Sequence, residues 1–112
     1  MSLTPADAGT FTRIIQKQTY ATIAASSGPT TLGATGSIGD LIGSLTVIPA
    51  TTSPGAITLT DGATAITVFA GGATSVADLK PFTIPLNIEA KGAGWKVTTG
   101  ANVSVIAAGV FT

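Results

Sequence analysis

The chain has 112 residues, 45% of them hydrophobic, which is enough for one domain with its own core. Only 9% are charged, against about 25% in an average soluble domain, and five basic residues balance five acidic ones. The basic residues are scattered, no apolar run approaches the roughly 18 residues of a membrane span, and cysteine is absent. The composition therefore argues against a nucleic-acid partner, a membrane helix, disulfides and thiolate metal sites.

Residues 1–15 are predicted to form an N-terminal arm that precedes a single β-sandwich domain at residues 16–112. The arm can be read as an extended segment or as a short amphipathic helical turn, and we favour the extended segment. Four apolar residues fall outside the strand pattern of the domain and are candidate assembly contacts: Phe11, Ile14, Ile15 and Tyr20. The N-terminus lacks the basic start and apolar core of a secretory signal, so we expect no export.

The first strand of the domain is expected within residues 18–25, where β-forming residues precede a Ser-Ser-Gly-Pro stop. Residues 26–39 are rich in Gly, Ser and Thr and are predicted to form a loop. Glycine recurs there at every third position, but neither spacing typical of a phosphate-binding loop is present. Residues 40–50 carry apolar side chains on both alternating faces, which indicates a central strand.

The strongest local signal is Asp61-Gly62 between two alternating segments, 57–60 and 63–69. A two-residue type I′ turn needs φ > 0 at both central residues, which Asp and Gly accept. The predicted pairs are Thr60 with Ala63, Leu59 with Thr64 and Ile57 with Ile66. The side chains that this register places on one face are Ile57, Leu59, Ile66 and Val68.

The remaining elements continue the same pattern. Residues 71–80 are predicted to be a loop, and strands are expected at 82–89, from Trp95 onward and at 102–111. About seven or eight strands, with turns every 8 to 12 residues or so, predict an all-β domain. Its architecture is expected to be an antiparallel β-sandwich or a jelly-roll-like barrel. No segment is long and periodic enough to predict a helix.

Candidates for catalysis are few, because histidine and cysteine are both absent. Their absence removes the usual nucleophilic triads and the imidazole or thiolate zinc sites. The carboxylates that remain are Asp7, Asp40, Asp61, Asp78 and Glu89. Asp40, Asp61, Asp78 and Glu89 each have a structural explanation in a turn, a loop or an outward strand position. We therefore expect no enzyme, no cofactor and no metal, with calcium at Asp61 or Asp78 as a weaker alternative.

Trp95 admits two interpretations, a stacking platform for a sugar or a core residue. It shares a strand face with Val97, beside the outward Lys96, which favours the core. Phe82 is predicted to be a core residue because it has the inward position on its strand. The tripeptide at 102–104 matches the N-glycosylation acceptor pattern, but without a secretory signal we interpret this match as chance.

Four segments carry recognisable strand and hairpin motifs: GDLIG at 39–43, ITLTDG at 57–62, PFTIPLNI at 81–88 and WKVTTGANVSVI at 95–106. Together they resemble a family of short proteins of tailed phages, whose usual pattern is a leucine-containing strand, an ITLYDG hairpin, a PF..PL.I strand and a terminal VTTGANVSVI strand. The resemblance covers residues 39–112, about two thirds of the chain. Thr60 stands where the family's hairpin often has Tyr, and residues 1–38 match nothing recognisable.

The resemblance implies a virion structural protein, a small decoration or cement protein on the outer surface of the phage head that is made in the host cytoplasm. Its expected partners are other copies of itself, as a homotrimer, and the major capsid protein, with the N-terminal arm helping to join them. The low charge favours a protein that is packed in an assembly. An alternative is a binding module of a tail or head fibre, in which loops such as residues 71–80 touch a host glycan or surface protein.

Overall fold

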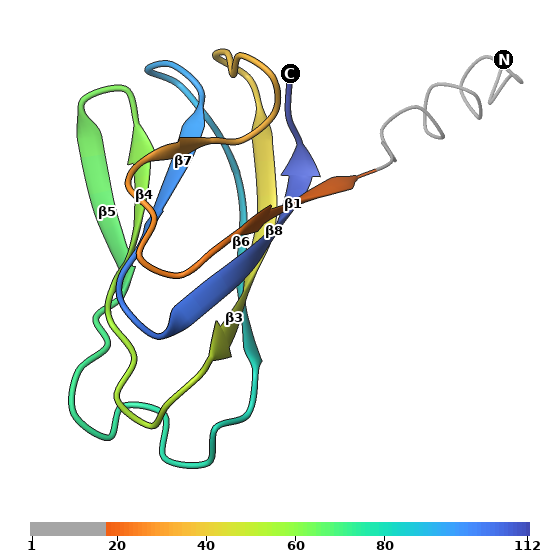
Figure 1. The fold of residues 1–112 in the computed structure, drawn as a ribbon. Coiled ribbons are helices and arrows are strands. Elements are labelled where there is room, and N and C mark those ends of the chain that lie inside the picture. The colour runs from red at the N-terminus through yellow and green to blue at the C-terminus, as the bar shows by residue number, and fades with distance from the viewer. Residues whose placement is uncertain (1–17) are drawn as a thin grey trace, which may run out of the picture.

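The computed structural model describes residues 18–112, and all regular structure in this part of the chain is β-strand (Figure 1). Its eight strands form two four-stranded antiparallel sheets, which confirms the predicted all-β sandwich. The strands are β1 (Thr19–Ile23), β2 (Thr30–Thr31), β3 (Leu41–Pro49), β4 (Ile57–Asp61), β5 (Thr64–Phe69), β6 (Phe82–Glu89), β7 (Trp95–Thr99) and β8 (Val103–Val110). Residues 18–112 include no helix with the length and apolarity needed to cross a membrane.

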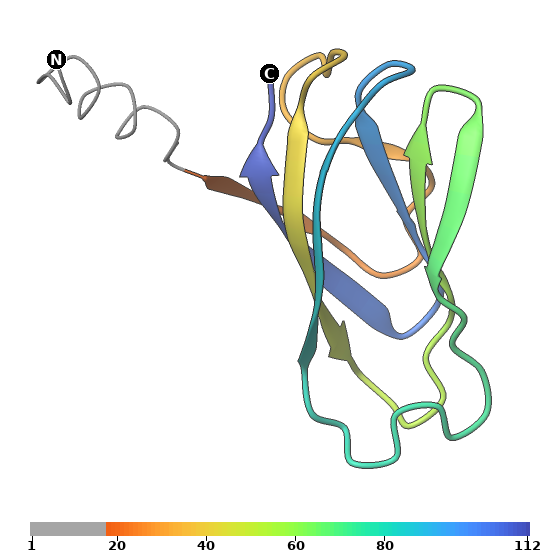
Figure 2. The same cartoon turned by 180° about the vertical axis from the view of Figure 1, so that it is seen from behind.

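The two sheets have the strand orders β1-β8-β3-β6 and β2-β7-β4-β5. Strands pair from the ends of the chain inward, first with eighth, second with seventh, third with sixth and fourth with fifth. This nested pairing is the topology of a jelly roll. It gathers β5 and β6 on one side of the sandwich, where the rings of Phe69 and Phe82 meet edge to face with centroids 5.4 Å apart. Figures 1 and 2 show the two layers from opposite sides.

The core lies between the sheets and is built from alternate residues of the strands. In β8, Val103, Val105 and Ala107 are buried, whereas the residues between them are half-buried. β3 alternates in the same way and is flanked by β8 and β6, so the prediction of a central strand is confirmed. Trp95 is 3% exposed and is a core residue, as predicted, while Phe82 is half-buried and packs against the core.

The β4–β5 hairpin forms at the predicted place, but its predicted register was wrong. Asp61 ends β4 and pairs with Thr64, so the connecting residues are Gly62 and Ala63. Of these two, only Gly62 has a positive φ, 62°, which fits a type II′ turn and not type I′. The physical reason is that the Asp61 carboxylate binds the backbone of the neighbouring β6–β7 connection, which keeps this residue in the strand.

From Thr58 to Asp61 the register is shifted by two residues, so these side chains keep their predicted faces, and a bulge beyond Thr58 then places Phe69 opposite Ile57. Leu59 lies opposite Ile66 rather than opposite Thr64. Leu59 is fully buried, whereas Ile66 is 41% exposed because β5 is the edge strand of its sheet. Of the predicted apolar face, Ile57 and Leu59 are therefore buried and Val68 is half-buried, and only Ile66 is exposed.

The prediction of a loop throughout residues 26–39 was wrong in part. Thr30 and Thr31 form β2 and pair with Val97 and Lys96 of β7. Leu32, which follows them, is fully buried in the core. A strand of two residues is too short to show an alternating pattern, so composition alone favoured a loop.

We expect Trp95→Ala to lower the free energy of unfolding by about 3 to 5 kcal/mol, because a fully enclosed large side chain leaves a cavity. Phe82→Ala should lower it by roughly half as much, since Phe82 is only partly removed from water. Chemical denaturation of both variants measures the difference. Equal, near wild-type stability of the two variants would contradict the assignment of the core.

We expect Gly62→Val to destabilise the protein by about 1 to 2 kcal/mol, because an L-residue with a side chain is strained at positive φ. The added Cβ itself has room, since its nearest neighbour lies at 3.5 Å. Ala63→Val is the matched control in the same turn, at an exposed residue without a positive φ. Equal unfolding midpoints for the two variants would show that the backbone of Gly62 imposes no constraint.

Candidate interaction sites

Asp61 ties the end of β4 to the connection between β6 and β7. Its carboxylate accepts backbone N–H bonds from Lys91, Gly92 and Ala93 at 2.9, 3.0 and 2.8 Å. The bond from the Lys91 N–H is the main cause that holds the pKa of Asp61 below its usual value, helped by the Ala93 and Gly92 N–H groups and the Lys91 charge. Both carboxylate oxygens bind backbone donors, so Asp61 fastens one connection to the other.

Asp40, directly before β3, joins three further segments. Its carboxylate accepts the backbone N–H of Ser37 at 3.1 Å and that of Thr112 at 3.2 Å, and its carbonyl oxygen accepts the indole N–H of Trp95 at 2.9 Å. Burial raises the pKa of Asp40, but the bonds from Thr112 and Ser37 outweigh it and leave the pKa lower than usual. From the sequence, Asp40 was expected only to lie at the start of a strand. The spacing Ser37-x-x-Asp40 was the one local pattern that indicated its bond with the Ser37 N–H.

The other two side-chain carboxylates of the described residues, Asp78 and Glu89, lie in different parts of the fold. Asp78 is in the β5–β6 connection, where its Oδ1 accepts the backbone N–H of Lys80 at 3.2 Å, and Glu89 is exposed at the end of β6. Residues 18–112 contain no group of three or more His, Cys, Asp or Glu side chains placed to hold a metal ion. Asp7 lies outside the described residues.

One broad surface is the outward side of the β1-β8-β3-β6 sheet, which we call the outer face. From the strand register, its members alternate with the buried core residues. They are Tyr20, Thr22, Leu41, Ser44, Thr46, Ile48, Thr83, Pro85, Glu89, Ser104, Ile106, Ala108 and Val110. Glu89, at the β6 edge, is the only charged residue among them. Tyr20 is 74% exposed here and pairs with Ala108, whereas Phe11, Ile14 and Ile15 lie outside the described residues.

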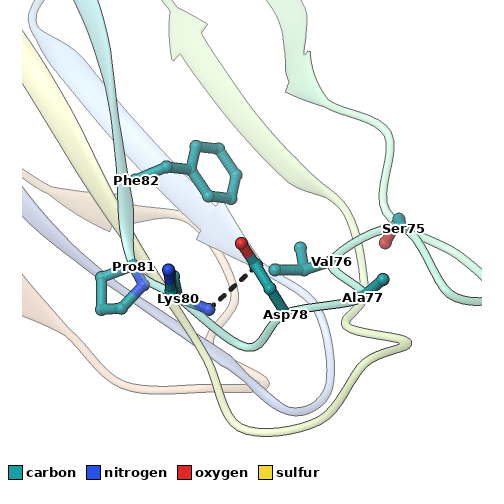
Figure 3. Close-up of a pocket in the computed structure, with 7 residues that line it drawn as sticks. All are labelled: Ser75, Val76, Ala77, Asp78, Lys80, Pro81 and Phe82. Atoms are coloured by element: carbon teal, nitrogen blue, oxygen red, sulfur yellow. Dashed lines mark hydrogen bonds between the residues drawn. The ribbon is translucent and has the colours of Figure 1, made fainter.

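A second feature is a hollow in the connection between β5 and β6, which we call the loop hollow (Figure 3). It is lined by Ser75, Val76, Ala77, Asp78, Lys80, Pro81 and Phe82. Thr74 and Leu79 in the same connection have positive φ angles of 57° and 59°, which are strained for such side chains. A bond from the Thr74 N–H to the Ser53 hydroxyl at 2.9 Å helps to hold this shape.

A third feature is a groove between the edges of the two sheets, which we call the edge groove. It has a volume of about 540 Å³ and is lined by Asp61, Thr64, Ile66, Ile88, Glu89, Lys91, Gly92 and Trp95. Ile66 of β5 and Ile88 of β6 are 41% and 39% exposed and lie on opposite walls. The sequence placed Ile66 on the apolar face of its hairpin, and Ile88 shares the alternation of the inward Phe82, but the sequence did not reveal that both strands are edges.

Comparison with models of known protein families gives no match, and neither do comparisons with curated proteins and with solved structures. The function is therefore inferred from the surfaces of the domain, its composition and the resemblance of its strand motifs.

We expect acid to destabilise the protein through Asp61 and Asp40. Their pKa values are lower in the folded chain than the ordinary value near 3.8. Their stabilising contribution is therefore complete at neutral pH and is lost as the pH falls below about 4 through the folded-state pKa. Asp61→Asn should be less stable than the wild type at pH 7 and should lose less stability on acidification.

Thermal unfolding of the wild type and Asp61→Asn between pH 7 and pH 2 measures this difference. Asp78→Asn is the matched control, because Asp78 accepts one exposed backbone bond only. Parallel pH profiles for the wild type and Asp61→Asn would show that the Asp61 carboxylate does not stabilise the fold through its charge.

Proposed function

We propose that this protein is a virion structural protein of a tailed phage, a decoration protein that assembles as a closed homo-oligomer, a trimer, on the outer surface of the head. It stabilises the shell and catalyses no reaction. Its partners are its own copies and the major capsid protein.

The outer face is the observation that carries this proposal. It extends over four strands and exposes hydroxyl groups and small or branched aliphatic side chains, with one charge at its edge. Such a face carries few charged groups that bind water strongly, so removing it from water costs relatively little free energy. This property suits docking on a large, preformed surface. Tyr20, with its apolar ring and polar hydroxyl, is the kind of residue that is enriched in interfaces.

Composition and fold support the same proposal. A chain with zero net charge and 9% charged residues has little electrostatic protection against self-association. Jelly rolls occur in viral capsid proteins, and also in lectins, so the fold favours neither class alone. The resemblance of the strand motifs to tailed-phage proteins favours the virion.

We expect particles that lack this protein to assemble but to rupture at a lower temperature than complete particles. Purified protein added back should bind to them and restore heat resistance. Ile106→Lys, at the centre of the outer face, should weaken binding to these particles at least tenfold, because it places an uncompensated charge in the contact.

Thr58→Lys is the matched control, since Thr58 is also β-branched and half-buried but lies on the outward side of the other sheet. Binding of both variants as tight as the wild type would refute docking through the outer face. Unchanged heat resistance of particles without the protein would refute the role in shell stability.

The loop hollow favours a second function, a fibre module that binds a host glycan. It combines Asp78, Lys80 and Ser75 with the Phe82 ring, and its connection has two strained residues, a feature that often accompanies binding loops. A glycan array separates the two functions, because decoration of a shell requires no affinity for sugars. Specific sugar binding that is lost in Asp78→Ala would favour the fibre module.

A further inference from the structure

We infer that the edge groove receives an extended strand, residues 10–16 of a neighbouring copy of the same chain, which pairs with the free edge of β5. This inference deepens the self-association that the proposed function includes, and it specifies the surface and the segment that form the contact. It does not require a phage shell.

The edge groove has the shape and chemistry for a strand with alternating apolar side chains. Its walls are β5 and β6, each of which exposes one isoleucine, and the indole of Trp95 lies against it from the core. Within residues 18–112, the edge strands β5 and β6 share one contact between aromatic rings, that of Phe69 with Phe82. An inserted apolar side chain would therefore cover Ile66 and Ile88 together.

Of the two edges that form the walls of the groove, that of β5 is suited to pairing with another strand. Its sequence Thr-Ala-Ile-Thr-Val-Phe contains no charge and no proline, and residues 64–67 pair with β4 without interruption. β6, the other wall, carries Pro85, a residue at positive φ at Asn87 and the charge of Glu89, features that typically block pairing at an edge. β2 has only two residues. A long, uncharged edge such as β5 is a ready template for β-augmentation.

Residues 10–16 have the sequence that such a template accepts. One alternation of Thr-Phe-Thr-Arg-Ile-Ile-Gln points Phe11, Arg13 and Ile15 to the same side. The two apolar side chains would fill the groove, and Arg13 would lie near its rim. Of the acidic residues that line the groove, Asp61 is buried and bound by three backbone N–H groups, which leaves Glu89, at the β6 edge, as the carboxylate that Arg13 would approach. Residues 8–17 contain no acidic residue that would oppose Glu89. The apolar alternation of the segment therefore matches the two exposed isoleucines of the groove.

The place where this segment joins the domain favours exchange between copies. It leads into β1, which lies at the opposite edge of the β1-β8-β3-β6 sheet from β6 (Figures 1 and 2). Three strand spacings, about 14 Å, separate those two edges, whereas residues 17 and 18, which link the segment to β1, can span only about 10 Å. Residues 10–16 are therefore too far from the groove of their own copy to enter it and would enter the groove of a neighbour.

Contacts of this kind join two different surfaces, a donor segment and an acceptor groove. Repetition of such a contact closes into a ring when the rotation between copies allows it. A closed trimer is thus compatible with one donor and one acceptor in each copy, and every groove is then filled.

The test uses full-length variants with only the donor or only the acceptor disabled. Ile66→Lys places a charge in the groove, and its matched control is Ile38→Lys, the same change at an isoleucine that is 66% exposed and outside the groove. The double variant Ile14→Asp, Ile15→Asp disables the donor in either alternation. Sedimentation at micromolar concentration should give the oligomer for the wild type and Ile38→Lys, and a monomer of 10.9 kDa for the other two.

An equimolar mixture of the two monomeric variants should form a dimer and nothing larger, because exactly one donor and one acceptor remain intact. Circular dichroism and thermal unfolding should show that each monomeric variant is folded. A monomeric wild type, an oligomer that persists in Ile66→Lys, or a mixture that stays monomeric would overturn the inference. Correct complementation together with unchanged heat resistance of phage particles would refute the decoration role alone.

Discussion

The burial of Trp95 between the two sheets is the interaction on which the rest of the structure depends. Trp95 begins β7 in one sheet, and its indole N–H reaches the carbonyl oxygen of Asp40 at the start of β3 in the other. The carboxylate of Asp40 then holds Ser37 and Thr112, so one residue connects the core with both the 33–39 connection and the end of the chain. Trp95 also pairs with Asp61, whose carboxylate holds the β6–β7 connection. The ring and the backbone of Trp95 together thereby connect the two carboxylates that hold one end of the sandwich.

The nested strand order explains why the free surfaces are where they are. Pairing from the chain ends inward makes β5 and β6 neighbouring edges, and no strand within residues 18–112 covers the outward side of the β1-β8-β3-β6 sheet. Polar groups on these surfaces are mostly threonine and serine hydroxyls, which can be removed from water at a smaller cost than charges. A chain with few charges is well suited to bury an edge in one neighbour and a face in another.

The sequence was informative where the pattern is local and uninformative where a contact joins distant segments. Apolar residues on both faces predicted β3, and strand patterns predicted β6, β8 and the burial of Trp95, because such patterns depend only on residues close in sequence. The register of the hairpin was missed because the partner of Asp61 lies 30 residues away, at Lys91. β2 and the exposure of Ile66 were missed because pairing and edge position are properties of the whole sheet.

Hydrogen exchange of the β5 amides in the assembled full-length protein tests the central claim, that assembly covers the free edge of this strand. Amides of β5 that do not bond to β4 should exchange slowly in the assembled wild type, at rates similar to those of β3, and rapidly in Ile66→Lys. Rapid exchange of these amides in the assembled wild type would show that the edge stays open and would contradict the account.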